Sequence, residues 1–243
     1  MKRFSLLSVL AAAWLSIACA GGSVSLDDVA QAGQELLGQN GPLSNDEITR
    51  GLKEALSKGS TAVVAQLGAR DGFAKDPAIK VPLPDTLRKA RDFASKVGLE
   101  GSFDDLELRL NRAAEQAAPK AKSLFLGAIK SMTLEDAGGI LKGPDDAATQ
   151  YFQRKTGASL KSSMRPLVDD ALAQVGAVNA FNKLLREYNS IPLAPKVEAD
   201  LTGHVVDEGA EGIFYYLARE EQAIRNDPLK RTSQLLQRVF GSQ

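Results

Sequence analysis

The central stretch over residues 102–152 constrains the fold most, because it is nearly free of loops and carries apolar residues on more than one side of a helix. A helix that is apolar on two sides normally runs through a bundle rather than lying on its surface. Aromatic residues make up only 6% of the chain while alanine is abundant, which also favours helices. We therefore expect an all-α fold with this stretch near its middle.

Apolar residues recur with a helical period along most of the chain. The pattern predicts about ten helices in a single bundle-like domain, with separate segments expected over 147–152, 158–164 and 166–175. Two proline-containing phrases, 79–84 and 191–195, interrupt the helices, and proline confines such a phrase to an extended or edge conformation. They could pair as a short ribbon or be unrelated loops.

The first twenty residues have the features of an export signal. Lys2 and Arg3 form a positively charged start, and residues 4–18 form an uncharged apolar run that is too short to span a bilayer comfortably. We therefore expect residues 1–20 to be a signal peptide, residues 21–43 to be a tether and a first helix, and residues 44–243 to form the helical domain. The protein is expected to be exported from a bacterial cytoplasm.

The position of the cleavage site has two interpretations. Cleavage after Ala20 would leave Gly21 as the new N-terminus and predicts a free periplasmic protein. The residues up to Cys19 also resemble a lipobox, although Ser16 stands where an aliphatic residue is usual; cleavage before Cys19 would then place a lipid on it and predicts an outer-membrane-anchored lipoprotein. In that case the membrane is contacted only through the N-terminal lipid.

Charge and residue usage argue against several classes of function. The chain has 30 basic and 30 acidic residues and no basic run, so nucleic acid is not expected as a partner. One histidine and one cysteine, which processing can remove, exclude Cys–His chemistry and ordinary zinc sites. No glycine-rich phosphate loop, serine elbow or nucleotide fingerprint is present. We expect no cofactor and no bound metal.

A polar cluster is predicted on the helix that begins near residue 103. Helical spacing places Asn111, Arg112 and Glu115 opposite an alanine-rich stripe, on the side that also carries Leu108. We expect this side to be packed, and Arg112 to pair with Glu115 three residues on. The cluster either binds a ligand or forms a buried salt bridge that holds the helix in register, and the second interpretation is favoured.

The helix expected over 202–225 carries a second set of charged candidates. Glu220 falls within its apolar stripe, where a carboxylate either pairs with a cation or has a raised pKa. Glu221 and Arg225 are expected at the edge of the stripe as an ion pair four residues apart. Glu220 could be a catalytic acid or part of a structural ion pair, and the structural pair is favoured. His204, on the same helix, is expected to point to solvent.

Several short sequences resemble the bacterial DUF4197 family. They are LNRAAE at 110–115, MTLEDA at 132–137, AATQYF at 147–152, EEQAIR at 220–225 and VFG at 239–241. The resemblance covers residues 43–241, and Leu110 departs from the methionine usual at that position, a change that conserves volume. It implies an exported, mostly helical envelope protein without an assigned activity, and it supplies no catalytic residues.

The function expected from these features is that of a binding or interaction module in the periplasm, with an envelope protein or a small ligand as partner. One alternative is a carboxylate-dependent hydrolase of envelope polysaccharide, with Glu220, Glu115 or Glu221 as its acid. Another is a protein that binds an acyl chain or a lipid, which predicts an apolar internal cavity.

Overall fold

A computed structural model describes residues 44–231 and 233–241 of the chain. The chain divides into two units, Met1–Pro42 and Leu43–Gln243, and the second holds all the described residues. The predicted signal peptide, the candidate lipid site Cys19 and the tether and first helix expected within residues 21–43 lie outside the described part.

The described residues form an all-α fold, as predicted from the sequence, and contain no strand. They hold nine α-helices, against the expected total of about ten for the whole chain, together with three 3₁₀ turns. The α-helices are α2 (Asn45–Leu67), α3 (Asp85–Ala94), α4 (Glu100–Ala117), α5 (Lys122–Ser131), α6 (Leu134–Leu141), α7 (Ala147–Gln174), α8 (Ala177–Asn189), α9 (Leu201–Asn226) and α10 (Gln234–Gly241). The 3₁₀ turns are η1 (Ser95–Val97), η2 (Ala118–Ala121) and η3 (Pro228–Lys230).

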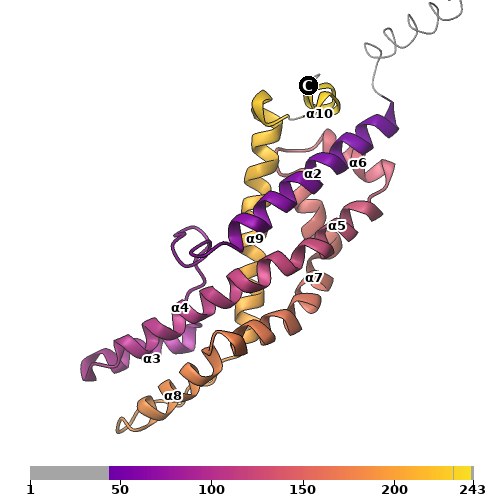
Figure 1. Cartoon of the computed structure of the whole chain (residues 1–243). Helices are drawn as coiled ribbons and strands as arrows, with labels where there is room; N and C mark the ends of the chain where they lie inside the picture. The colour runs from indigo at the N-terminus through magenta and orange to yellow at the C-terminus, as the bar shows by residue number, and fades with distance from the viewer. Residues whose placement is uncertain (1–43, 232, 242–243) are drawn as a thin grey trace, which may run out of the picture. The chain divides into compact units, whose positions relative to one another are not determined.

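Helix α4 runs through the middle of the domain and packs on α7, α8 and α9. Its residues Phe103, Leu106 and Leu110 are fully buried on one side, and Asn111 and Glu115 are buried on the adjacent side, so α4 is covered on more than one side. Helix α9 crosses α2 and α4 and lies along α7 (Figure 1). Helices α5, α6 and α10 pack chiefly on α2, so α2, α4, α7 and α9 are the elements on which the rest of the domain is packed.

Helix starts follow the capping signals in the sequence. The side chain of Ser44 accepts a hydrogen bond from the N–H of Glu47, whose carboxylate accepts one from the N–H of Ser44 in return. Thr133 and Asp136 form the same reciprocal pair at the start of α6. Two of the four N–H groups that a helix start leaves free are therefore satisfied at each site.

One proline follows the end of a helix and another lies inside one. Pro119 lies in η2, directly after the end of α4. The break expected at Pro166 is wrong, since α7 is one continuous helix of 28 residues with Pro166 inside it. Pro166 is exposed while Met164 and Val168 beside it are buried, so packing of the flanking residues offsets the lost hydrogen bond.

The ribbon considered for 79–84 and 191–195 does not form, because both phrases lie in loops without strand pairing. Residues 79–84 are held instead by side chains of α4 and α9. The second phrase forms the connection from α8 to α9. The prolines of both phrases lack the N–H groups that a ladder of strand hydrogen bonds would need.

Candidate functional site

The predicted cluster on α4 holds the loop between α2 and α3. Glu115 is only 4% exposed, and its Oε1 accepts hydrogen bonds from the N–H groups of Phe73 at 3.2 Å and Ala74 at 3.1 Å. Asn111 is fully buried and bonds the backbone of Val81 twice: its Oδ1 accepts from the N–H at 2.9 Å, and its Nδ2 donates to the carbonyl at 2.7 Å. Both side chains therefore replace backbone partners that the loop lacks.

Arg112 completes this cluster by bridging two carboxylates. Its Nη1 donates to Glu115 Oε2 at 2.7 Å, as the sequence spacing predicts, and its Nη2 donates to Asp71 Oδ1 at 2.6 Å. The hydrogen bond from Arg112 lowers the pKa of Asp71, and the bond to Glu115 raises the pKa of Arg112. The expectation for Leu108 is wrong, because its side chain is 45% exposed.

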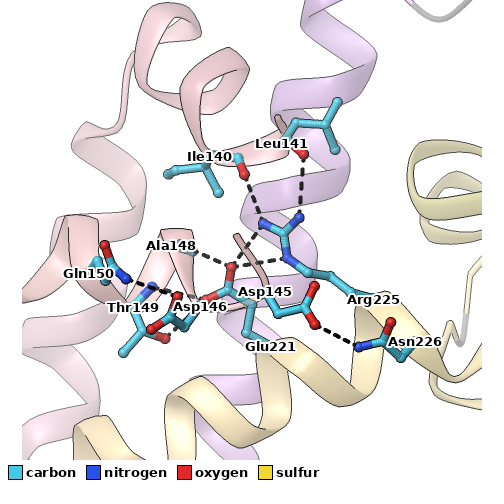
Figure 2. A network of polar contacts seen from close by, with 10 residues as sticks. All are labelled: Ile140, Leu141, Asp145, Asp146, Ala148, Thr149, Gln150, Glu221, Arg225 and Asn226. Atoms are coloured by element: carbon cyan, nitrogen blue, oxygen red, sulfur yellow. Dashed lines mark hydrogen bonds and ion pairs between the residues drawn. The ribbon is translucent and has the colours of Figure 1, made fainter. Parts of the chain in front are cut away.

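The charged pair on α9 joins the ends of two other helices (Figure 2). Glu221 Oε1 accepts from the N–H of Ala148 at 2.9 Å, and Oε2 accepts from the N–H of Thr149 at 3.0 Å and from its hydroxyl at 3.0 Å. These groups belong to the first turn of α7, where the helix dipole favours a negative charge. Glu221 therefore acts as an N-terminal cap supplied by a distant part of the chain.

Arg225 gives the matching contacts at the end of α6. Its guanidinium donates to Glu221 Oε1 at 2.9 Å and 3.2 Å, to the carbonyl of Ile140 at 2.8 Å and to that of Leu141 at 3.4 Å (Figure 2). The side chains of Glu221 and Arg225 are 5% and 6% exposed. The expected ion pair therefore forms, lies buried inside the domain, and bonds the start of α7 and the end of α6.

Glu220 is less buried than its predicted place in the apolar stripe implies, but it pairs with a cation as expected. Its side chain is 28% exposed, lies against Gly59 of α2 and forms an ion pair with Lys230 at 3.7 Å. On a helical wheel Glu220 and Glu221 flank the apolar stripe on its two sides, so only the position of α6 and α7 decides which of them is buried. His204 is also partly buried, contrary to expectation, and its Nε2 donates to the carbonyl of Pro82 at 2.7 Å.

Glu115 and Glu221 are thus fully occupied by backbone N–H groups and an arginine. A general acid needs a proton-bearing oxygen that can reach a substrate, and neither carboxylate has one to spare. The six candidate residues also do not form one site: Asn111, Arg112 and Glu115 hold the loop before α3, whereas Glu220, Glu221 and Arg225 lie on α9, where the latter two join α6 to α7.

A cleft of about 500 Å³ lies between the loop at 78–80, the start of α7 and one face of α9. Its polar lining comes from Lys80, Asp146, Thr149, Gln150, Gln153, Glu208, Glu211 and Tyr215. This cleft was not predicted from the sequence. The helical spacing of Glu208, Glu211 and Tyr215 on one face of α9 was the one sign of it in the sequence. The other walls of the cleft, the loop at 78–80 and the start of α7, come from distant parts of the sequence.

Close backbone packing forms one wall of this cleft. A Cβ atom added to Gly212 would lie 2.9 Å from Phe73 Cε1 and 3.2 Å from Ile79 Cβ, so the glycine lets the loop approach α9. Glu115 and Asn111 hold this loop from the other side, and Asp76 accepts a hydrogen bond from the hydroxyl of Tyr216.

Among the described residues, no group of three or more histidine, cysteine, aspartate and glutamate side chains is arranged to hold a metal ion. In the same part of the chain, no helix is both long and apolar enough to cross a bilayer.

Comparison with known proteins identifies a family but no characterised relative. No curated protein and no solved structure matches the chain. The family model described as "Protein of unknown function (DUF4197)" matches residues 42–241, which is most of the chain. The chain belongs to the DUF4197 family.

Proposed function

We propose that this protein is an exported binding module of the bacterial envelope, and that the cleft between α7, α9 and the loop at 78–80 receives its ligand. The charged start and apolar run of residues 1–20 support export. Cleft size carries the binding proposal: 500 Å³ is within the range of about 300–1,000 Å³ that small-molecule sites occupy.

The lining of the cleft favours a polar ligand that is uncharged or positively charged. Glu208 and Glu211 have no hydrogen-bond or ion-pair partner among the described side chains. Lys80, the one lining lysine, pairs with Glu107 outside the cleft, so its charge is already compensated. An anion would be repelled by the unpaired carboxylates, whereas hydroxyl, amide or ammonium groups would find acceptors in them and in Gln150 and Gln153.

Native mass spectrometry of the protein released gently from its host envelope tests this proposal. We expect an added mass on the folded domain that persists through mild purification. The double variant E208Q/E211Q should lose this mass, because it removes the two unpaired charges without changing side-chain size. The variant E198Q is the matched control, since the carboxylate of Glu198 is exposed outside the cleft. Equal retention of the mass by both variants would contradict the proposal.

The same spectra test the proposed location. An N-terminus that carries lipid on Cys19 would make the protein a membrane-anchored lipoprotein, whereas a start at Gly21 would make it a free periplasmic protein. A chain that keeps residues 1–20 and remains in the cytoplasm would refute export, and with it the assignment of an envelope ligand.

A further inference from the structure

The connection between α8 and α9 holds an apolar side chain fully in water. Leu193 is 99% exposed, and its backbone has a φ of 64°, in the left-handed region. This region is unfavourable for residues with a Cβ and is used routinely by glycine and asparagine. A turn that served only to reverse the chain would be more stable with one of those residues. Leucine at this position therefore indicates a role outside the fold.

The loop around Leu193 is held in place, so the side chain is a fixed projection. The N–H of Ile191 donates to the carbonyl of Tyr188 at 3.0 Å, and that of Ala194 donates to the carbonyl of Ile191 at 3.2 Å. Ile191 and Ala194 pack against the core, and prolines flank Leu193 at 192 and 195. An apolar group that is already ordered loses little conformational freedom when it enters another apolar phase.

One side of α3 and η1 lies beside this loop. Thr86 Oγ1 donates to the carbonyl of Glu198 at 3.1 Å, and the rings of Phe93 and Tyr188 pack edge to face at 6.2 Å. Lys89 and Lys96 share the helical spacing of Thr86 and Phe93, so they lie on the same side of the helix. Figure 1 shows α3 and the end of α8 at the same end of the domain.

This end of the domain has an excess of unpaired positive charge. Lys89, Lys96, Arg186 and Lys196 are exposed and form no ion pair with described residues, against three exposed acids that also form none, Asp92, Glu100 and Glu198. The other cations here are compensated, since Arg88, Arg91 and Lys183 pair with Asp85, Asp104 and Glu187. We call Leu193, Lys196, Lys89 and Lys96 together the Leu193 surface.

We propose that the Leu193 surface rests on an anionic lipid bilayer, with the leucine inserted at the level of the acyl chains and the lysines at the headgroups. The composition favours a bilayer over a protein partner. Lysine is depleted in protein interfaces, and leucine is under-represented among their energetically dominant residues. Leucine surrounded by lysine is instead typical of segments that lie in the interface of anionic membranes.

Contact through one leucine and a few lysines is weak and reversible. Its effect is to orient the domain on a membrane that it already approaches, with α3 and the α8–α9 loop facing the lipid. Helix α9 begins after this loop and has 26 residues, so it is about 39 Å long and its other end lies at the opposite end of that length. Leu229 follows that other end and is 90% exposed, which makes it a matched control.

Tryptophan fluorescence of the full chain tests the proposal. The sequence contains one tryptophan, Trp14, so the variants W14F/L193W and W14F/L229W each carry a single reporter. We expect vesicles of phosphatidylcholine with about 30% phosphatidylglycerol to shift the emission of residue 193 to the blue and to expose it to quenching by bromine-labelled acyl chains. The reporter at 229 should keep the emission of an exposed indole, even if the N-terminus holds the protein on the vesicle.

Charge variants test the role of the lysines in the same assay. The added change K89E/K196E should raise the vesicle concentration needed for half the shift by about 30-fold or more, since each lysine near an anionic surface contributes about fivefold. The control K120E/K122E changes two exposed lysines outside this surface and should have little effect. Equal responses of the two reporters, no response at 193, or a shift caused by lipid-free envelope extract would each overturn the proposal.

Discussion

Replacing Glu221 by glutamine should destabilise the domain strongly, even though the change is isosteric. The variant leaves Arg225 buried without its counter-charge and turns an amide N–H₂ or a weaker acceptor towards the N–H groups of Ala148 and Thr149. Removal of one partner from a buried, hydrogen-bonded ion pair costs about 3–5 kcal/mol. For a domain of this size the expected loss in melting temperature is about 6–20 °C.

Equilibrium unfolding in urea, followed by circular dichroism, measures this change as a lower midpoint at an unchanged slope. The control E220Q alters the neighbouring carboxylate, which is 28% exposed and forms a long ion pair with Lys230 at 3.7 Å. The free energy of unfolding of this variant should stay within about 0.5 kcal/mol of that of the native protein. The double variant E221Q/R225M should lose less than the sum of its single variants by at least about 1 kcal/mol, because the two side chains share one network. Similar midpoints for E221Q and E220Q would refute the structural assignment of Glu221.

Three further predictions concern packing, pH and backbone strain. G212A should destabilise the domain by about 1–3 kcal/mol because its Cβ would meet Phe73 at 2.9 Å, whereas G209A, with open space around its Cβ, should stabilise it by up to about 1 kcal/mol; thermal unfolding separates the two. Burial and the hydrogen bond to a carboxylate of α6 raise the pKa of Tyr151 to about 12, so its contribution to stability is complete below pH 10 and is lost as the pH rises towards that pKa. Unfolding measured across this range should therefore show a cost for Y151F at pH 8 that shrinks above pH 10, and a constant cost would contradict the assignment. L193N should raise the free energy of unfolding by about 1 kcal/mol, because asparagine tolerates the left-handed backbone and no packing is lost; a midpoint lowered by the change would show that the leucine packs in solution.

Several local features of the fold depend only on residues that are close in the sequence. Both capping boxes, the end of α4 at Pro119 and the pairs Arg112–Glu115 and Glu221–Arg225 depend on residues at most four positions apart. Such contacts are determined by helix geometry alone. The unbroken course of α7 through Pro166 was missed because the packing that offsets the proline comes from helices elsewhere in the chain.

The burial of Glu221 in place of Glu220 shows where sequence reasoning ends. The two residues flank the same stripe, so the helical period does not distinguish them. The start of α7 and the end of α6 determine which of the two is buried, because they present two N–H groups and two carbonyls that bond Glu221 and Arg225. Contacts with backbone groups from distant parts of the chain cannot be predicted from the spacing of residues along one helix.

The short sequences that relate this chain to its family are mostly those that hold backbone ends together. Asn111 and Glu115 bind the loop before α3, and Glu221 and Arg225 join α6 to α7. Their chemistry requires these residue types at these positions whatever the domain binds, so the family pattern identifies the fold more than the activity. Glu208 and Glu211 face the cleft without a structural contact in the described chain, and no stability argument accounts for them. Variants at these two positions should therefore change ligand binding, while the free energy of unfolding in urea stays within about 0.5 kcal/mol of the native value. A larger loss of stability would show that Glu208 and Glu211 have a structural role.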